Sequence, residues 1–180
     1  MSTRTIVVNI FGGPCVGKST LAAAVYAELS QRALHCELVR AAAKSLIWRE
    51  DWESLKDAQA IHEVRYAEML RLYGNIDAIV TDSPLLMDII YAGEEWDYEQ
   101  VAVRHFHEFR AENYLLERSP IIRYDHRGRH CTEEEAEGYS DRLREILAQY
   151  EIPHSVVRLH PVNDLLIGTI ADRVIRRLRE

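Results

Sequence analysis

The sequence predicts an α/β fold in which a five-stranded parallel sheet is covered by helices on both faces. Three observations indicate this fold: five short apolar stretches, segments with helical spacing between them, and a composition that is 47% hydrophobic and 28% charged over 180 residues. Strands that alternate with helices are typical of parallel sheets, because each parallel connection must cross over the sheet. A chain of this length forms one ordinary domain, so we expect residues 1–180 to be a single unit.

The predicted strands have the length and apolar character of buried strands in a parallel sheet. The first is the run TIVVNIF, which directly precedes a glycine-rich loop. The five predicted strands cover residues 5–11, 35–39, 78–82, 113–118 and 155–159.

The predicted helices connect these strands. The first begins in the glycine loop and ends near residue 32. Two later helices have N-terminal caps in the sequence, because Thr132 with Glu135 forms a capping-box signature and Asn163 precedes the last apolar-periodic segment. The remaining predicted helices cover residues 57–73, 99–112 with the weakest pattern, 132–150, and the segment from 163 onward.

Charge and cysteine content restrict the class of protein. The net charge of −7 argues against wrapping of nucleic acid by the whole surface, but leaves room for a local basic patch. Cys15, Cys36 and Cys131 form no CxxC pair, so we expect reduced thiols and a cytoplasmic protein. No apolar run approaches the roughly 20 residues of a membrane span, and residues 1–4 are too few for a signal peptide.

The stretch GGPCVGKST matches the P-loop pattern Gly-x-x-x-x-Gly-Lys-Ser, between a β-branched strand and a helix. Its glycines let backbone N–H groups point at phosphate oxygens, and the helix N-terminus adds its positive dipole end. Lys18 is placed to reach the β- and γ-phosphates of ATP, and the Ser19 hydroxyl to ligate Mg²⁺. The predicted nucleotide-binding residues are Gly12, Gly13, Pro14, Cys15, Val16, Gly17, Lys18, Ser19 and Thr20.

Other motifs decide between the classes of P-loop protein. A GTPase would carry a DxxG after a strand and an NKxD motif, but the DxxG at residues 125–128 follows no predicted strand and NKxD is absent. An AAA-type motor needs a helical lid domain and sensor residues, for which 180 residues leave little room. We therefore predict a P-loop NTPase of the nucleoside- or nucleotide-kinase type with a mobile, arginine-rich lid.

Asp82 ends the apolar run IDAIVT, at the position of a Walker B carboxylate. Such an aspartate organises Mg²⁺, directly or through water, or takes the proton of the acceptor hydroxyl. The alternative is a plain Asp-Ser-Pro turn, since these residues favour turns. Because the residue ends the third predicted strand, we predict that Asp82 is catalytic and that it shares the metal with Ser19.

An arginine-rich segment over residues 119–131 forms the predicted lid, and Gly128 gives it mobility. Small kinases need a lid that brings guanidinium groups onto the transferring phosphoryl group and excludes water. The alternative is a solvated loop that pairs with the acidic run after it. We predict Arg127 and Arg129 as catalytic donors, whereas Arg118 ends a strand and can pair within the scaffold.

The acceptor side is predicted from the end of the second strand and the helices after it. Trp48 could stack on a base and Gln59 could read one, although each candidate can equally be structural or solvated. His62, His105 and His107 show no metal-ligand constellation, so we expect ordinary residues there. The acceptor candidates are Arg40, Lys44, Trp48, Gln59 and Arg65.

The stretches GGPCVGKST, ELVRAAAKSLIW, TDSPLL and RGRHCTEEEA resemble a family of phage-encoded, thymidylate-kinase-like P-loop kinases. Some of these act as 5-hydroxymethyluracil DNA kinases, which phosphorylate the hydroxymethyl group of a modified base in phage DNA during thymidine hypermodification. The resemblance covers nearly the whole chain. It implies ATP and Mg²⁺ as cofactors, residues 12–20 as the ATP site, Asp82 as the Mg²⁺ or acceptor-side carboxylate, and a location in the cytoplasm of the host cell.

One departure from that family concerns the catalytic base. Related kinases often place a carboxylate just after the second strand, whereas this chain reads VRAAAK over residues 39–44. Either Asp82 serves alone, the base lies elsewhere, or the site is altered. Transfer can survive without such a base, because it depends mostly on positioning and charge stabilisation.

The sequence leaves the acceptor open. A kinase of free nucleosides or nucleoside monophosphates is the alternative to a DNA kinase, since DNA binding needs several phosphate contacts and the chain is acidic. A slow ATPase switch or assembly module is the second alternative. The predicted partner is a nucleotide-like acceptor and not a membrane, and the sequence leaves a homodimer open.

Overall fold

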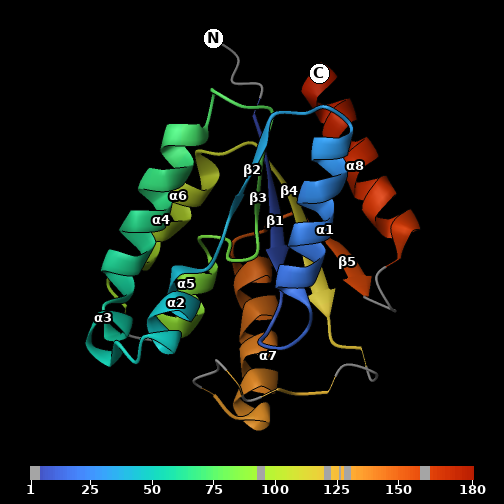
Figure 1. The fold of residues 1–180 in the computed structure, drawn as a ribbon. Helices are drawn as coiled ribbons and strands as arrows, with labels where there is room; N and C mark the ends of the chain where they lie inside the picture. Colours follow the sequence, from blue (N-terminus) through green and yellow to red (C-terminus); the bar gives the residue numbers. More distant parts are fainter. Residues whose placement is uncertain (1–4, 93–95, 120–122, 126, 128–130, 159–162) are drawn as a thin grey trace.

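Five parallel strands form one sheet in the order β2-β3-β1-β4-β5, with helices on both faces (Figure 1). The structure is a computed structural model that describes residues 5–92, 96–119, 123–125, 127, 131–158 and 163–180. The predicted five-stranded parallel α/β fold is confirmed. The strands are β1 (Ile6–Phe11), β2 (Cys36–Val39), β3 (Ala78–Thr81), β4 (Ala111–Glu117) and β5 (Ser155–Arg158).

The helices of the described residues include five predicted segments and three short additional ones. The additional helices α2, α3 and α5 have seven, five and six residues, too short for a periodic pattern in the sequence. The helices are α1 (Lys18–Gln31), α2 (Ala42–Trp48), α3 (Trp52–Lys56), α4 (Ala58–Leu72), α5 (Met87–Ala92), α6 (Glu99–His107), α7 (Glu133–Gln149) and α8 (Asp164–Arg179). Among the described residues, no helix combines the length and apolar character that crossing a bilayer requires.

The helix predicted over residues 99–112 was too long, because α6 ends at His107 and β4 begins at Ala111. Hydrogen bonds to the rest of the protein explain the early end. The N–H of Val7 donates to the carbonyl of Arg110 at 2.9 Å, and the N–H of Arg110 donates to the Tyr73 hydroxyl at 2.8 Å. These contacts draw the chain into the sheet beside β1.

The core lies on both sides of β1, whose six residues are all buried. Successive side chains of a strand point to opposite faces. Accordingly, Val7 and Phe11 pack in one apolar cluster with residues of α4, α5, α6 and α7. Ile6, Val8 and Ile10 pack in a second cluster with residues of α1 and α8.

The position of β1 also places the loops that carry function. It lies between β3 and β4, and Asn9 is in register with Thr81 of β3. The loops after β1 and β3 therefore emerge side by side at the carboxyl edge of the sheet. This is the edge at which open α/β sheets bind ligands.

The predicted capping box at the start of α7 is confirmed. Thr132 Oγ1 accepts from the N–H of Glu135 at 3.2 Å, and the Glu135 carboxylate accepts from the N–H of Thr132 at 2.6 Å. These two bonds satisfy backbone donors that a helix start leaves open. They fix the point at which the segment after β4 becomes helical.

Replacing the cap, Thr132→Ala, should lower the free energy of unfolding by about 1 kcal/mol, because one N-terminal donor of α7 loses its acceptor. Thr169→Ala in α8 is the matched control. Thr169 is exposed and its hydroxyl donates back to the carbonyl of Leu165, so we expect a change below about 0.5 kcal/mol. Chemical denaturation of both variants measures the difference, and equal values would contradict a stabilising cap.

Candidate functional site

The glycine loop adopts the turn that a phosphate cradle requires. Gly12 has φ 150° and Gly17 has φ 99°, values that favour glycine, and α1 begins directly at Lys18. A Cβ atom on Gly12 would lie 2.7 Å from Val16 Cγ2 and 2.8 Å from the carbonyl oxygen of Leu116. The loop is therefore closed tightly over the end of β4, with the N-terminus of α1 facing the space above it.

Gly13 allows the loop to touch α7. A Cβ atom there would lie 2.2 Å from Ser140 Oγ and 2.9 Å from the carbonyl oxygen of Ala136. The Lys18 ammonium donates to the Gly13 carbonyl at 2.7 Å, across the loop. The loop therefore packs against α7, and the side chain of Lys18 crosses it.

A cavity of about 600 Å³ opens in front of this loop. Loop residues form one wall, and residues of α2, α3, α4, α5 and α7 contribute to the others. Trp52, Tyr91 and Tyr139 contribute aromatic surface. The charged lining residues are Lys18, Lys44, Lys56, Arg65, Asp82 and Asp88.

Asp82 lies at the end of β3 and lines the cavity with Lys18 and Ser19. It is 5% exposed, and its Oδ1 accepts from the N–H of Ala41 at 3.1 Å. This bond ties the end of β3 to the segment that follows β2. It holds the carboxylate against the acid-free stretch VRAAAK.

The acceptor candidates divide into two groups. Lys44 and Arg65 line the cavity. Arg40, Trp48 and Gln59 are exposed and are not among its lining residues. Trp48 in particular is 64% exposed, so in this structure it stacks on nothing inside the cavity.

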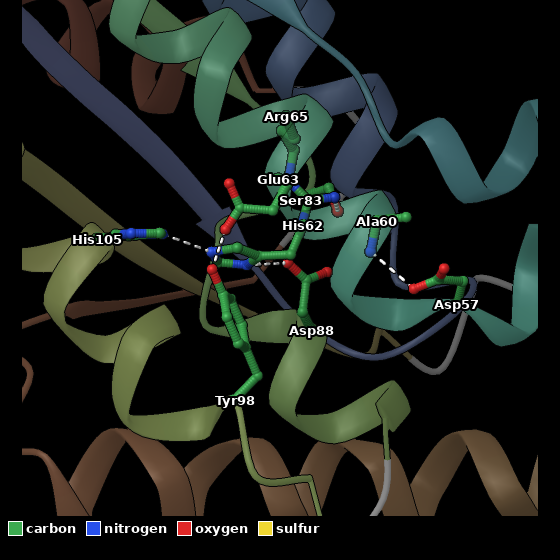
Figure 2. A network of polar contacts seen from close by, with 9 residues as sticks. All are labelled: Asp57, Ala60, His62, Glu63, Arg65, Ser83, Asp88, Tyr98 and His105. Carbon is green, nitrogen blue, oxygen red and sulfur yellow. Dashed lines mark hydrogen bonds and ion pairs between the residues drawn. The ribbon is translucent and has the colours of Figure 1, made fainter.

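Sequence reasoning missed a buried polar network beside the cavity (Figure 2). The Arg65 guanidinium donates to Ser83 Oγ at 3.0 Å and pairs with Oδ2 of Asp88. The Nδ1 atom of His62 lies 2.8 Å from the same oxygen. The sequence contains one signal for this network, since Asp88 is a lone charge in the apolar run LLMDII.

The sequence shows no metal-ligand spacing for His62, His105 and His107, yet the fold brings two of these histidines together. His62 Nε2 lies 3.0 Å from His105 Nδ1, and the carboxylate of Glu63 lies close to both rings. Burial, together with the neighbouring His62, lowers the pKa of His105. Burial and a hydrogen bond to Glu108 raise the pKa of Tyr66, which stacks on His105, to about 12.

Part of the predicted lid is described. Arg118 pairs with Glu133 at 2.8 Å and Glu137 at 3.6 Å, so its predicted pairing within the scaffold is confirmed. Arg127 pairs with Asp125 at 3.0 Å and is 84% exposed, outside the cavity lining. Arg129 lies outside the described residues. Cys15 Sγ donates to the carbonyl of Asp125 at 3.4 Å, which joins the glycine loop to this segment.

The loop after β1, the carboxylate after β3 and the helices around the cavity define a P-loop fold. The chain belongs to the AAA domain family, because the model of that family, AAA_28, matches residues 7–164. Within the described residues, α8 is the helix that follows β5.

A solved structure of similar fold is that of a deoxyadenosine kinase from M. mycoides, with the products dCMP and a flexible dCDP bound. It matches with a TM-score of 0.60 and 18% sequence identity, over 94% of this chain and 99% of that chain. The nucleoside-kinase type of fold predicted from the sequence is thereby confirmed. No curated protein sequence matches the chain.

The contact between Gly13 and α7 can be tested with a pair of alanine variants. Gly13→Ala should destabilise the protein by about 1–3 kcal/mol and weaken ATP binding, because the loop or α7 must shift. Gly138→Ala lies in α7 itself, where nothing stands within 4 Å of the new Cβ, and should stabilise by about 0.5–1 kcal/mol. Thermal unfolding and nucleotide titration check both, and a harmless Gly13→Ala would contradict the close contact.

Proposed function

We propose that the chain is an ATP- and Mg²⁺-dependent kinase that moves the γ-phosphoryl group of ATP to a hydroxyl of a nucleotide-like acceptor. The observation that carries this proposal is the shared cavity. Lys18 and Ser19 of the P-loop, the carboxylate of Asp82 and the Arg65–Asp88 pair all line it. A donor-side and an acceptor-side set of groups therefore meet in one space.

The donor set fits ATP and Mg²⁺. The glycine loop ends at the N-terminus of α1, where backbone N–H groups are open to phosphate oxygens, and Ser19 and Asp82, which line the same cavity, offer the oxygen ligands that Mg²⁺ prefers. Ser19 and Asp82 would hold Mg²⁺, which would supply positive charge against the charge that develops on the phosphates during transfer. Lys18, at the N-terminus of α1, is the residue that holds the β- and γ-phosphates.

The transfer step needs little covalent chemistry from the protein. The acceptor oxygen bonds to the γ-phosphorus, the bond from that phosphorus to the β–γ bridging oxygen breaks, and ADP leaves. In this proposal Asp82 takes the proton of the acceptor hydroxyl. The stretch after β2, which contains no acidic residue, then has no catalytic role. Arg127 and Arg129 approach the phosphoryl group when the lid closes, and Arg127 exchanges its partner Asp125 for the phosphate.

The charge of the cavity supports an anionic ligand. Its lining holds four cationic side chains and two carboxylates, although the chain as a whole carries a net charge of −7. Because Asp88 is already paired with Arg65, the lysines leave the cavity locally positive. Phosphate groups of a nucleotide, or of a nucleic acid backbone, fit this surface.

For the acceptor itself we propose the hydroxymethyl group of 5-hydroxymethyluracil in phage DNA, on the resemblance described above. The cavity of about 600 Å³ has room for one nucleoside, so a base in a duplex would have to be flipped into it. Lys44 and Lys56 line the cavity and offer contacts to flanking phosphates. Arg65 and Asp88 line the cavity, so the base of the acceptor would lie beside this ion pair.

A free nucleoside or nucleoside monophosphate is the second candidate. The net charge of −7 and the size of the cavity favour it, and the kinase of similar fold binds dCMP. A slow ATPase switch is the third candidate. It would bind no acceptor, so the Arg65–Asp88 pair in the cavity wall would contact no substrate.

The acceptor is identified by incubating the protein with γ-labelled ATP and Mg²⁺ against three sets of substrates. These are DNA that contains 5-hydroxymethyluracil, the same DNA with thymine, and a panel of free nucleosides and monophosphates. We expect label on the modified DNA and none with Lys18→Ala protein. Label on free nucleosides or monophosphates would replace the acceptor, and inorganic phosphate as the sole labelled product would support the switch.

The role of Asp82 is tested by Asp82→Asn, which should reduce turnover about 100-fold or more while leaving the fold intact, because a proton acceptor is lost. Asp77→Asn is the matched control. Asp77 precedes the opposite end of β3 and accepts from the N–H of His35, away from the cavity. Steady-state kinetics with both variants decide the matter, and near-normal turnover of Asp82→Asn would contradict this assignment.

A further inference from the structure

Two histidine rings from different helices meet edge to edge, nitrogen toward nitrogen, between α4 and α6, which run side by side along one face of the sheet (Figures 1 and 2). His62 is fully buried in α4, and His105 lies half-buried in α6. Their centroids are 5.3 Å apart with an interplanar angle of 19°. The neighbour of His62 in α4, Glu63, directs its carboxylate to the same point.

We propose that His62, Glu63 and His105 form a binding site for a divalent transition-metal ion of the zinc type. Each residue offers one ligand atom, and these atoms all lie within 4.8 Å of one another. The nitrogens His62 Nε2 and His105 Nδ1 are 3.0 Å apart. Two imidazoles on one tetrahedral zinc ion would have their nitrogens about 3.3 Å apart, given zinc–nitrogen bonds of about 2.0–2.1 Å.

The contact of His62 Nδ1 with Asp88 leaves the other ring nitrogen, Nε2, to face a metal. Its Nδ1 lies 2.8 Å from Oδ2 of Asp88, and an ionised carboxylate can only accept a hydrogen bond. The proton of a neutral His62 ring is therefore on Nδ1, and the lone pair is on Nε2, which faces His105. A carboxylate that orients a histidine ligand through its other nitrogen is the usual outer support of a zinc site.

The remaining groups around the three residues complete such a support. The Tyr98 hydroxyl donates to the Glu63 carboxylate, which fixes that side chain. Tyr66 stacks on His105 with ring centroids 3.6 Å apart, and Trp96 meets the edge of His62 at 6.0 Å. These aromatic rings restrict access of water and hold both imidazoles in place.

The chemical nature of the three ligands favours zinc over magnesium and calcium. Two imidazoles and one carboxylate form the donor set of known zinc sites, with a fourth position for water or another ligand. Mg²⁺ and Ca²⁺ prefer oxygen ligands throughout, so they would bind here poorly. The site is distinct from the proposed Mg²⁺ position, because none of its three ligands is among the residues that line the cavity.

The metal site would also support the cavity wall. His62 and Arg65 both bind Oδ2 of Asp88, and Arg65 and Asp88 line the cavity. A metal on Nε2 makes the Nδ1 proton of His62 a stronger donor, and so holds Asp88 and Arg65 in one arrangement. This last effect rests on the proposed function, whereas binding of the ion does not.

The experiment titrates Zn²⁺ into the metal-free full chain by calorimetry, without nucleotide or acceptor, so that its outcome is independent of kinase activity. The variants are His105→Ala and Glu63→Gln, which change half-buried positions, with His107→Ala as the matched control. His107 is an exposed histidine two residues along α6. Circular dichroism verifies that each variant is folded, and substitution with Co²⁺ reports the ligands through its visible absorption.

We expect the wild-type chain and His107→Ala to bind one Zn²⁺ with equal affinity and to gain thermal stability from it. His105→Ala removes a proposed ligand, so it should weaken Zn²⁺ binding strongly. The loss of affinity should exceed the roughly 10- to 100-fold that follows removal of an outer-shell partner. Glu63→Gln should weaken binding in the same direction. The proposal is overturned if the wild-type chain binds no Zn²⁺, or if His105→Ala and Glu63→Gln bind it as the wild type does, since the ion would then sit elsewhere.

Discussion

The parallel pairing of β1 with β3 is the constraint on which the rest of the site depends. The register of Asn9 with Thr81 brings the ends of the two strands together. Backbone amides of the glycine loop and a carboxylate about 70 residues further along the chain then face one cavity. Each loop alone would be an ordinary turn, and the pairing makes them two halves of one site.

The second constraint is the cost of burying charge beside that cavity. Arg65 and Asp88 are 2% and 6% exposed, and neither would be tolerated there without the other. Ser83 and His62 take up further hydrogen-bonding capacity of the pair. Through these contacts α4 and α5 are held against the end of β3. The wall of the cavity is consequently a polar structure inside an otherwise apolar layer.

Local signals in the sequence predict the parts of the protein that local chemistry determines. The five strands, the P-loop and the capping box of α7 follow from apolar runs, glycine spacing and the Thr132–Glu135 pair, and all are present. The end of α6 could not be predicted in the same way, because Tyr73 and Val7 determine it from distant positions. The histidine pair was missed for the same reason, since His62 and His105 are 43 residues apart.

The central claim is that one cavity holds both the phosphoryl donor and its acceptor. A crystal structure with a non-hydrolysable ATP analogue, Mg²⁺ and a nucleoside tests it most directly. We expect the γ-phosphate against Lys18, the acceptor hydroxyl beside Asp82, and the base near Arg65 and Asp88 in that cavity. A triphosphate bound away from the glycine loop, or a nucleoside bound outside the cavity, would contradict it.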